Sequence, residues 1–172
     1  MSLVDLADRH TALFLRYEKS IRSYLTLKAK DRTFDCGEKP LIFILTGAPG
    51  CGKTCLAREC FPSAYWLSKP NGNQQLWFDG YRGQEVLIVD EFYSWIPYDL
   101  LCRLWDYYAL WLPYKGGSAK CGFKIFVFAS NESVVHWYPK VENKGAFWRR
   151  ITEFALVHEW NNDKKQFERI KY

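Results

Sequence analysis

The sequence predicts an α/β domain with a parallel sheet of about five strands, helices on both faces of that sheet and a small helical segment at the N-terminus. Three apolar runs predict this class. The run at 41–45 leads through a glycine-rich turn into a helix, which is the pattern of a strand–turn–helix unit. The runs at 86–89 and 125–129 are apolar and end in polar side chains, as buried parallel strands do when their carboxyl ends reach a binding site.

The composition suits one globular domain and excludes several other classes of protein. The chain has 172 residues, of which 48% are hydrophobic and 18% aromatic, so it is not intrinsically disordered. No apolar stretch approaches the ~18 residues of a membrane span, and the N-terminus lacks the basic and apolar regions of a signal peptide. We therefore expect an intracellular protein with no membrane partner.

Cysteine spacing and charge distribution narrow the range of ligands. The six cysteines and three histidines show none of the spacings typical of zinc sites, so we expect reduced and mostly buried thiols. The net charge is +5, and no carboxylate occurs between Asp106 and Glu132, a stretch that contains Lys115, Lys120 and Lys124. A polyanion would therefore meet little repulsion in this part of the chain.

Residues 1–35 form the first of two predicted regions, and residues 36–172 form the α/β domain. Between 3 and 28, apolar and charged residues recur at helical spacing, which predicts one or two helices. The stretch 31–40 then has the character of a linker. The helices could pack on their own domain or serve as a collar that binds neighbouring subunits, and the pattern is compatible with both.

The turn after the first apolar run carries the G-x-x-x-x-G-K-[ST] pattern of a phosphate-binding loop. Its glycines allow the backbone to approach a triphosphate closely, so that N–H groups point at the phosphate oxygens. Lys53 adds a positive charge for the β- and γ-phosphates, and Thr54 offers a hydroxyl to Mg²⁺. The predicted nucleotide-binding residues are Gly47, Ala48, Pro49, Gly50, Cys51, Gly52, Lys53 and Thr54. The sequence thus predicts a P-loop domain that binds a nucleoside triphosphate with Mg²⁺.

Two adjacent carboxylates, Asp90 and Glu91, follow the second buried strand. Asp90 is placed to hold Mg²⁺ directly or through water, and Glu91 to orient or deprotonate an attacking water molecule. Asn131 follows the third strand, where its amide can contact the γ-phosphate or that water. We interpret Lys53, Asp90, Glu91 and Asn131 as catalytic residues, and Thr54 and Asp90 as the metal ligands.

The segments between these strands predict further elements. A short strand is predicted at 64–68, and a helix begins at Pro97 and ends near Tyr108. The stretch 111–123 is typical of a β-hairpin with a Gly-Gly turn and an exposed tip. The candidate nucleic-acid contacts are Lys115, Gly116 and Lys120. Solvated lysines are common at such tips, which is the alternative to a binding role.

The C-terminal region is predicted to hold a last strand at 151–160 and a charged tail from 164 onward that frays. Arg149 and Arg150 precede the strand. Paired arginines at the edge of a nucleotide-hydrolysing domain suggest a finger that reaches into a neighbour's site, where it can raise the rate about 10³- to 10⁵-fold. Local ion pairs on the surface are the alternative for both arginines.

The ordered set of motifs resembles the superfamily 3 helicase domain of replication initiator (Rep) proteins from circovirus-like, circular single-stranded DNA viruses. The resemblance rests on the P-loop and on the stretches 77–81, 86–97, 115–118, 128–131 and 148–151, and it is close over residues 40–160. It implies an AAA+-like fold in which 47–54 is Walker A, Asp90 and Glu91 end Walker B, and Asn131 is motif C. It also implies a DNA-contacting hairpin centred on Lys115, and a finger at Arg149 or Arg150 that acts in trans.

The resemblance implies a function as well. Members hydrolyse ATP with Mg²⁺ and form homo-oligomeric rings, usually hexamers, that move three-prime to five-prime on single-stranded DNA in rolling-circle replication. The N-terminal helices would then be the oligomerisation collar, and a viral Rep protein would act in the host nucleus. The chain lacks the His-hydrophobe-His pair of the Rep nuclease, so we expect it to be the helicase part alone. It also carries Asp90-Glu91 where members often have Asp-Asp.

Two alternatives remain open from the residues themselves. A P-loop nucleotide kinase would need an acceptor pocket, whereas an Asp-Glu pair suits the activation of water. A nucleotide-gated assembly or packaging module would not need the catalytic residues that this chain retains. The residues alone also do not decide between DNA and RNA.

Overall fold

The computed structural model describes residues 8–28, 32, 39–72 and 74–172. Contacts divide the chain into two units, Met1–Lys30 and Asp31–Tyr172. The first unit contains helix α2 (Thr11–Lys28), which agrees with the helical spacing in the sequence. The predicted helical positions 3–7, most of the predicted linker and Cys36 lie outside the described residues. No helix in the described parts of the chain combines the length and the apolar character needed to cross a membrane.

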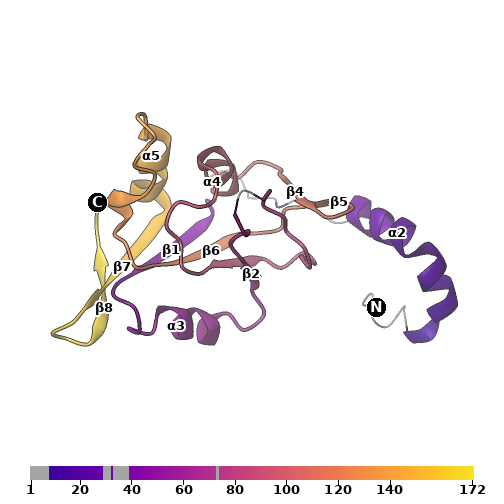
Figure 1. Cartoon of the computed structure of the whole chain (residues 1–172), viewed down its shortest axis with the longest axis horizontal. Helices are drawn as coiled ribbons and strands as arrows, with labels where there is room; N and C mark the ends of the chain where they lie inside the picture. The colour runs from indigo at the N-terminus through magenta and orange to yellow at the C-terminus, as the bar shows by residue number, and fades with distance from the viewer. Residues whose placement is uncertain (1–7, 29–31, 33–38, 73) are drawn as a thin grey trace. The chain divides into compact units, whose positions relative to one another are not determined.

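The second unit is built on a mixed sheet of six strands in the order β2-β3-β6-β1-β7-β8 (Figure 1). The strands are β1 (Leu41–Thr46), β2 (Tyr65–Leu67), β3 (Val86–Val89), β6 (Ile125–Ser130), β7 (Ala155–Asn161) and β8 (Gln166–Ile170). The first five in the spatial order pair in parallel, and β8 pairs antiparallel with β7 at one edge. The predicted parallel sheet is thus confirmed.

The prediction of a fraying tail is wrong, because residues 166–170 form the edge strand β8. Side chains in the preceding turn explain the difference. The Asn161 carboxamide oxygen accepts hydrogen bonds from the backbone N–H groups of Asp163 and Lys164, which closes the turn. Phe167 then packs its ring 5.1 Å from that of Trp160 on β7. These contacts stabilise the strand pair despite the high charge of the tail.

Helices cover both faces of the sheet, as the sequence predicts. Figure 1 shows α3 (Lys53–Cys60) on one side, with α4 (Tyr98–Leu104) and α5 (Gly145–Phe154) on the other. The side chains of successive strand residues alternate between these faces. Leu45 of β1 packs in the same cluster as Ala57 of α3, while Ile44 belongs to the larger cluster under α4 and α5.

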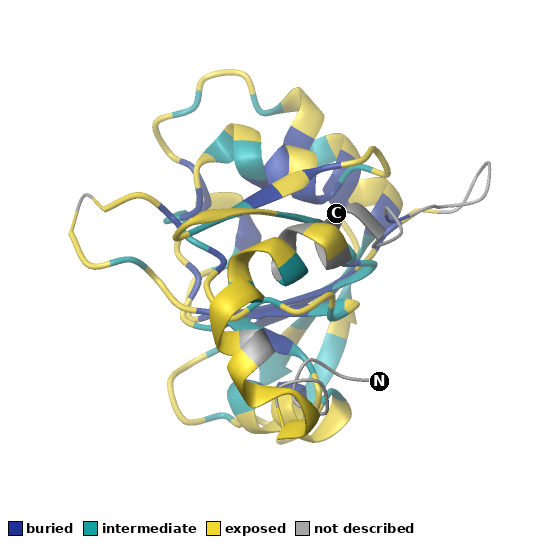
Figure 2. Ribbon diagram, turned by 90° about the vertical axis from the view of Figure 1, so that its right-hand side faces the viewer, coloured by how far each residue is buried: buried dark blue, intermediate teal, exposed yellow. Residues whose placement is uncertain are grey.

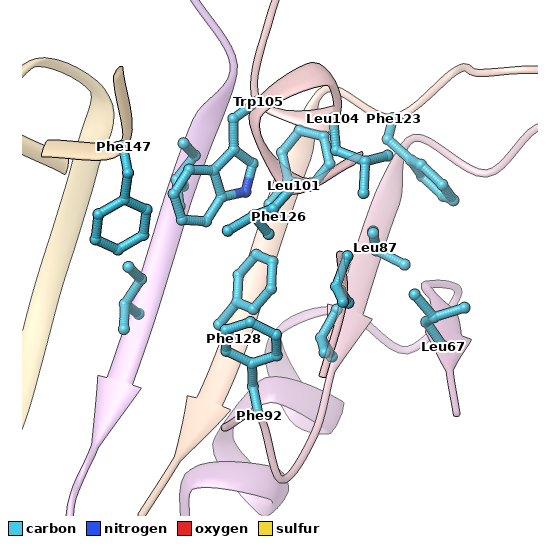
Figure 3. Packing of buried hydrophobic residues seen from close by; sticks show 14 of the residues in the cluster. Leu67, Leu87, Phe92, Leu101, Leu104, Trp105, Phe123, Phe126, Phe128 and Phe147 are labelled. Atoms are coloured by element: carbon cyan, nitrogen blue, oxygen red, sulfur yellow. The ribbon is translucent and has the colours of Figure 1, made fainter. Parts of the chain in front are cut away.

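Aromatic rings fill the larger cluster (Figure 3). The ring of Phe128 on β6 lies 5.0 Å from Phe92 and 5.3 Å from Trp105, and Trp105 stacks on Phe147 of α5 at 5.8 Å. Figure 2 shows that burial is concentrated on the strands, whereas the connecting loops are mostly exposed. These aromatic rings pack against the α4 and α5 face of the sheet and hold the central strands in place, and their carboxyl ends with them.

Two helix boundaries differ from the sequence prediction. Residues 151–154 belong to helix α5 and not to the last strand, because Phe147, Ile151 and Phe154 occur at helical spacing and are buried together. Helix α4 ends at Leu104, short of the predicted end at Tyr108. Its last carbonyl groups accept hydrogen bonds from the side chain of Arg32, where the backbone N–H groups of a further α-helical turn would otherwise donate. The C-terminal strand β7 consequently begins only at Ala155.

Candidate nucleotide site and nucleic-acid surface

The P-loop follows β1 and holds Lys53 inside the protein. The lysine is only 7% exposed, and its ammonium group donates to the carbonyl oxygens of Gly47 at 2.7 Å and Ala48 at 2.9 Å. The Sγ atom of Cys51 lies 3.6 Å from the same nitrogen. The loop therefore keeps a buried cation at the start of α3, held by backbone oxygens that an incoming phosphate could replace.

Two glycines of the loop are required by different features of the structure. A Cβ atom on Gly47 would lie 2.6 Å from the Cβ of Trp160 on β7, so no larger residue fits against that strand. Gly52 is the N-cap of α3 and has a left-handed backbone with φ 93°. The helix therefore begins with no side chain over its first N–H groups, which leaves them accessible to an anion.

Thr54 and Asp90 meet across the site. The Thr54 hydroxyl lies 3.0 Å from each of the two carboxylate oxygens of Asp90, although the residues are 36 positions apart in the sequence. Asp90 directly follows β3, and its Oδ1 atom also accepts a hydrogen bond from the backbone N–H of Glu91. This places a hydroxyl and a carboxylate side by side next to Lys53, which is an oxygen pair of the kind Mg²⁺ prefers.

Glu91 has a left-handed backbone with φ 46°, which is uncommon for a residue other than glycine. Two contacts hold it there. The Trp95 indole N–H donates to the Glu91 carbonyl oxygen at 3.1 Å, and the N–H of Phe92 donates to the Ala129 carbonyl oxygen at 2.8 Å. Strain of about 1–3 kcal/mol is commonly stored at functional sites. Sequence analysis included Trp95 in the stretch 86–97 that carries the family resemblance, but it did not assign this residue a role in holding Glu91.

One pocket of about 320 Å³ joins the ends of β1, β3 and β6. Its lining residues are Pro49, Gly50, Gly52, Lys53, Thr54, Cys55, Asp90, Glu91, Ala129 and Asn131. Lys53, Asp90 and Asn131, which the sequence analysis assigned as catalytic candidates, thus line the same pocket. Gly47, Ala48 and Cys51 do not line the pocket, but all three contact the Lys53 ammonium group. Cys55 was not predicted, and its hydrogen bond to Glu59 raises the pKa of the thiol.

The cysteines differ from the sequence prediction. Cys55 and Cys60 are exposed and Cys51 is half-buried, so only Cys102 and Cys121 among the five described cysteines are buried. All five are free thiols. Within the described residues, no group of three or more histidine, cysteine or carboxylate side chains is arranged to hold a metal ion. A divalent ion at the pocket would therefore depend on Thr54, Asp90 and oxygen atoms of a bound ligand.

The two adjacent arginines of α5 occupy opposite environments. The Arg150 side chain is 7% exposed and forms an ion pair with Asp106 at 2.7 Å, and it also donates to the carbonyl oxygen of Ala146. The Arg149 side chain is 51% exposed and lies 3.6 Å from Glu153 on the same helix. Only Arg149 is placed on the surface, where it could reach another molecule.

The predicted hairpin is present as β4 (Trp111–Tyr114) and β5 (Gly117–Lys120). Its loop has two residues, Lys115 and Gly116, and Gly116 has φ 99° as the turn requires. The Lys115 backbone N–H donates to Asp79 Oδ1 at 2.8 Å, and its ammonium group lies 3.7 Å from Asp79 Oδ2. Sequence reasoning identified the 77–81 turn but did not assign Asp79 this role as a support for the hairpin.

Comparisons with known proteins identify the family of this chain. The family model described as "RNA helicase" matches residues 43–132, which is the stretch from β1 to just beyond β6. The replication-associated protein of Porcine circovirus 2 is 35% identical over 96% of this chain and 51% of its own length. That of Porcine circovirus 1 is 37% identical over 88% and 48%, and that of Goose circovirus 31% identical over 91% and 51%. The chain therefore spans about half the length of these relatives.

A solved structure aligns more distantly. The apo structure of the NrS-1 C-terminal region has a TM-score of 0.47 and 20% identity, and the alignment covers 93% of this chain and 36% of that one. The kinase and packaging alternatives are not favoured by the comparisons. On the family match and the circovirus relatives together, the chain belongs to the RNA helicase family and is a superfamily 3 helicase domain of the circovirus Rep kind.

Proposed function

We propose that this domain is an ATP-driven motor that moves along single-stranded DNA in the rolling-circle replication of a viral genome in the host nucleus. The observation that carries the proposal is the convergence of Lys53, Asp90 and Asn131 on one pocket from the ends of three parallel strands. Such a constellation gives one site a phosphate-binding cation, a metal-binding carboxylate and an amide that can contact the reacting phosphate.

The side chains supply binding and orientation for the triphosphate. Lys53 would exchange its carbonyl partners for the β- and γ-phosphate oxygens, and the N–H groups at the start of α3 would bind the remaining charge. Thr54 and Asp90 would hold Mg²⁺, which when bound neutralises charge on the phosphates. The 3.0 Å contacts between the Thr54 hydroxyl and both Asp90 oxygens support this choice of ligands.

Glu91 and Asn131 are the candidates for water activation and phosphate sensing. Both line the pocket, and Glu91 is exposed to solvent at its edge. The bond from Trp95 fixes the Glu91 backbone, so that its carboxylate can orient or deprotonate a water molecule from a defined position. Asn131 lies at the end of β6, where its amide could distinguish a γ-phosphate from an empty site.

Hydrolysis at subunit interfaces would couple the pocket to movement on nucleic acid. Arg149 is exposed and can act on a neighbour's site, whereas Arg150 is held within its own chain. Helix α2 exposes Leu15 and Tyr17, which suits a segment that assembles with other copies. We therefore assign Arg149 as the finger and α2 as the collar of a homo-oligomeric, hexameric ring.

The hairpin is the proposed contact with DNA. Lys115 and Gly116 form its tip, and Lys120 lies on β5 in a stretch without carboxylates. Loss of the γ-phosphate removes contacts made by Asn131 and by a neighbour's Arg149, and such a change can shift the hairpin between two positions. Lys115 would then carry the phosphate backbone with it.

The decisive experiment measures ATP hydrolysis against chain concentration, with single-stranded DNA, with single-stranded RNA and without nucleic acid. We expect a steep rise with chain concentration because the site is shared, and stimulation by DNA. In the Lys53→Ala chain, hydrolysis should fall at least about 10²-fold because the phosphates lose a preorganised charge. Lys140→Ala removes an exposed lysine outside the pocket and should hydrolyse ATP normally. Unchanged phosphate release by Lys53→Ala would contradict the motor.

A further inference from the structure

We propose that Trp111, with Lys120 beside it, is a base-stacking contact for single-stranded nucleic acid on the exposed face of the hairpin. The inference rests on the proposed function and extends it. A lysine at the hairpin tip would bind phosphates, whereas Trp111 would bind the bases themselves. The hairpin would then bind single-stranded nucleic acid through two kinds of contact, one with the phosphates and one with the bases.

The exposure of Trp111 is the first observation. The structure describes all eight tryptophans, and Trp111 alone belongs to the exposed class, with 47% of its surface accessible, while the others are buried or half-buried. A large ring left in water forgoes the stabilisation that burial gives elsewhere in this aromatic-rich chain. An exposed aromatic ring is also the kind of side chain on which the bases of single-stranded nucleic acid stack.

The hairpin presents this ring on a defined face. Trp111 pairs with Lys120 across the two strands, so their side chains lie on the same face. The neighbouring pair, Leu112 with Ala119, points to the opposite face, where Leu112 is fully buried in the core. Burial of Leu112 fixes which face is turned outward, and Trp111 therefore stands on a supported platform and not on a free loop.

The turn side of the hairpin is also well packed. A Cβ atom on Gly117 would lie 2.7 Å from the hydroxyl oxygen of Tyr114, so the tyrosine ring covers this glycine closely. The backbone N–H of Phe78 donates to the Pro113 carbonyl oxygen at 2.8 Å, which joins the hairpin to the 77–81 turn. A platform of this kind loses little conformational entropy when a base stacks on it.

The charge beside the ring selects the kind of ligand. The Lys120 ammonium group lies 5.9 Å from the centre of the Trp111 ring, and no carboxylate occurs between Asp106 and Glu132. A strand of nucleic acid offers a flat ring and a phosphate within the same nucleotide, which matches an indole next to an ammonium group. An acidic peptide would match the charge but would not need the exposed face of the indole.

The test compares the full chain and its Trp111→Ala variant on two fluorescein-labelled oligonucleotides of equal length, oligo(dT) and a wholly abasic strand. Wild type should prefer the strand that carries bases. Trp111→Ala should lose about 5- to 100-fold in affinity for oligo(dT) and little for the abasic strand. Trp111→Phe should recover most of the preference because it keeps a stacking ring.

Two control variants separate stacking from other roles. Lys115→Ala should lower the affinity for both oligonucleotides similarly and reduce the salt dependence of binding, as expected for a phosphate contact. Trp111→Ala should leave the salt dependence unchanged. Tyr93→Ala removes another exposed ring that has a lysine over it, outside the hairpin, and should keep the base preference. Thermal melts of each variant check that the hairpin remains folded.

Each contrary result has a distinct meaning. If Trp111→Ala lost affinity equally for oligo(dT) and for the abasic strand, or lost affinity for neither, the stacking role would be overturned while the proposed motor stayed intact. A change in sedimentation of Trp111→Ala without a change in base preference would show that another copy of the chain covers the ring, and would also overturn it. Failure of the wild type to bind either strand would instead overturn the nucleic-acid function and the stacking role together.

Discussion

The nucleotide pocket and the region around α4 and α5 are held together in different ways. Backbone pairing positions the pocket, because β1 pairs with β6 residue by residue up to Thr46 and Ser130, and β3 pairs with β6 up to Val89 and Phe128. Once three parallel strands are in register, their ends must meet at one edge of the sheet. The chemistry of this pocket then depends only on which side chains follow each strand.

Buried arginines hold the second region instead. The Arg32 guanidinium donates to the carbonyl oxygens of Arg103 at 2.8 Å, Leu104 at 2.6 Å and Tyr108 at 3.0 Å, and burial lowers the pKa of Arg32. Asp106 lies in the same stretch and pairs with Arg150 of α5. We call Arg32, residues 103–108 and Arg150 the arginine network. It joins the segment before the hairpin to the helix that carries the proposed finger.

The contrast has a practical consequence for substitutions. In the pocket, replacing a side chain removes chemistry and leaves the backbone pairing intact. In the arginine network, replacing a side chain leaves a buried charge or several carbonyl groups without a hydrogen-bond partner, so the folded state loses stability. The neighbouring residues Arg149 and Arg150 allow this difference to be measured at one place.

The largest effect is expected for Arg149→Ala. Loss of a finger in trans should lower ATP hydrolysis about 10³-fold, while stability should change by no more than about 0.5 kcal/mol because the pair with Glu153 is exposed. Hydrolysis assays and urea unfolding check the two parts. Lys39→Ala, which removes the other cation near Glu153, is the matched control and should hydrolyse ATP normally.

Mixing gives the sharper version of this prediction. Arg149→Ala chains combined with Lys53→Ala chains should regain part of the activity, because some interfaces then contain an intact pocket and an intact finger. Absence of any recovery would count against a shared site. A large loss of stability in Arg149→Ala would contradict the assignment of Arg149 as the finger and of Arg150 as the structural residue.

Arg150→Met should show the opposite pattern. Removing the cation leaves the Asp106 carboxylate largely buried and unpaired, which we expect to cost about 3 kcal/mol of unfolding free energy. Urea unfolding measures this directly, and nucleotide binding by the folded protein should be retained. The double variant Asp106→Asn/Arg150→Met should recover part of the loss, since it leaves no unpaired charge. A loss below about 0.5 kcal/mol in Arg150→Met would contradict a structural role for the pair.

Two truncations test the boundary between the units. A chain that starts at residue 31 keeps Arg32, whereas one that starts at residue 36 lacks it. Both should assemble poorly if α2 is the collar, but only the shorter chain should lose about 2 kcal/mol of stability, because the carbonyl groups of 103, 104 and 108 lose a charged donor. Sedimentation and urea unfolding separate the two effects. Arg32→Met in the full chain should lower stability without affecting assembly. Equal stability of the two truncated chains would contradict a stabilising role for Arg32 in the arginine network.

The contrast between the pocket and the arginine network also explains which contacts could be predicted from the sequence. Lys53, Asp90 and Asn131 follow apolar strands, so their convergence is predictable from strand patterning and from the phosphate-loop motif. The arginine network is not predictable in this way. Arg32 is 71 or more positions from its partners, and Arg150 differs from Arg149 only in the face of α5 it occupies. Nothing local in the sequence distinguishes a buried arginine from an exposed one.

The predicted helix and strand boundaries at the C-terminus were wrong for a related reason. Residues 151–154 carry a β-branched and aromatic pattern that is compatible with a strand, but Ile151 and Phe154 pack in the core together with Phe147, which decides for the helix α5. The edge strand β8 depends on a turn closed by the Asn161 side chain. Both outcomes follow from side-chain contacts that a periodicity argument does not contain.

The smallest effect is expected at β8, where side chains extend a sheet that is otherwise built by backbone pairing. The Glu168 carboxylate accepts hydrogen bonds from Lys164 at 2.6 Å and Asn161 at 2.9 Å, and these bonds, the one from Lys164 first, lower its pKa below the ordinary value of 4.5. A depressed pKa means that the ionised group stabilises the folded strand above pH 4.5, and that this contribution is lost as the pH falls through the lowered pKa. The protection factors of the β8 amides against hydrogen exchange, which correct for the slower intrinsic exchange in acid, should therefore fall on acidification more for wild type than for Glu168→Gln, while protection in β1 should be the same in both. An equal response of the two chains would show that the turn at Asn161 alone holds the edge strand.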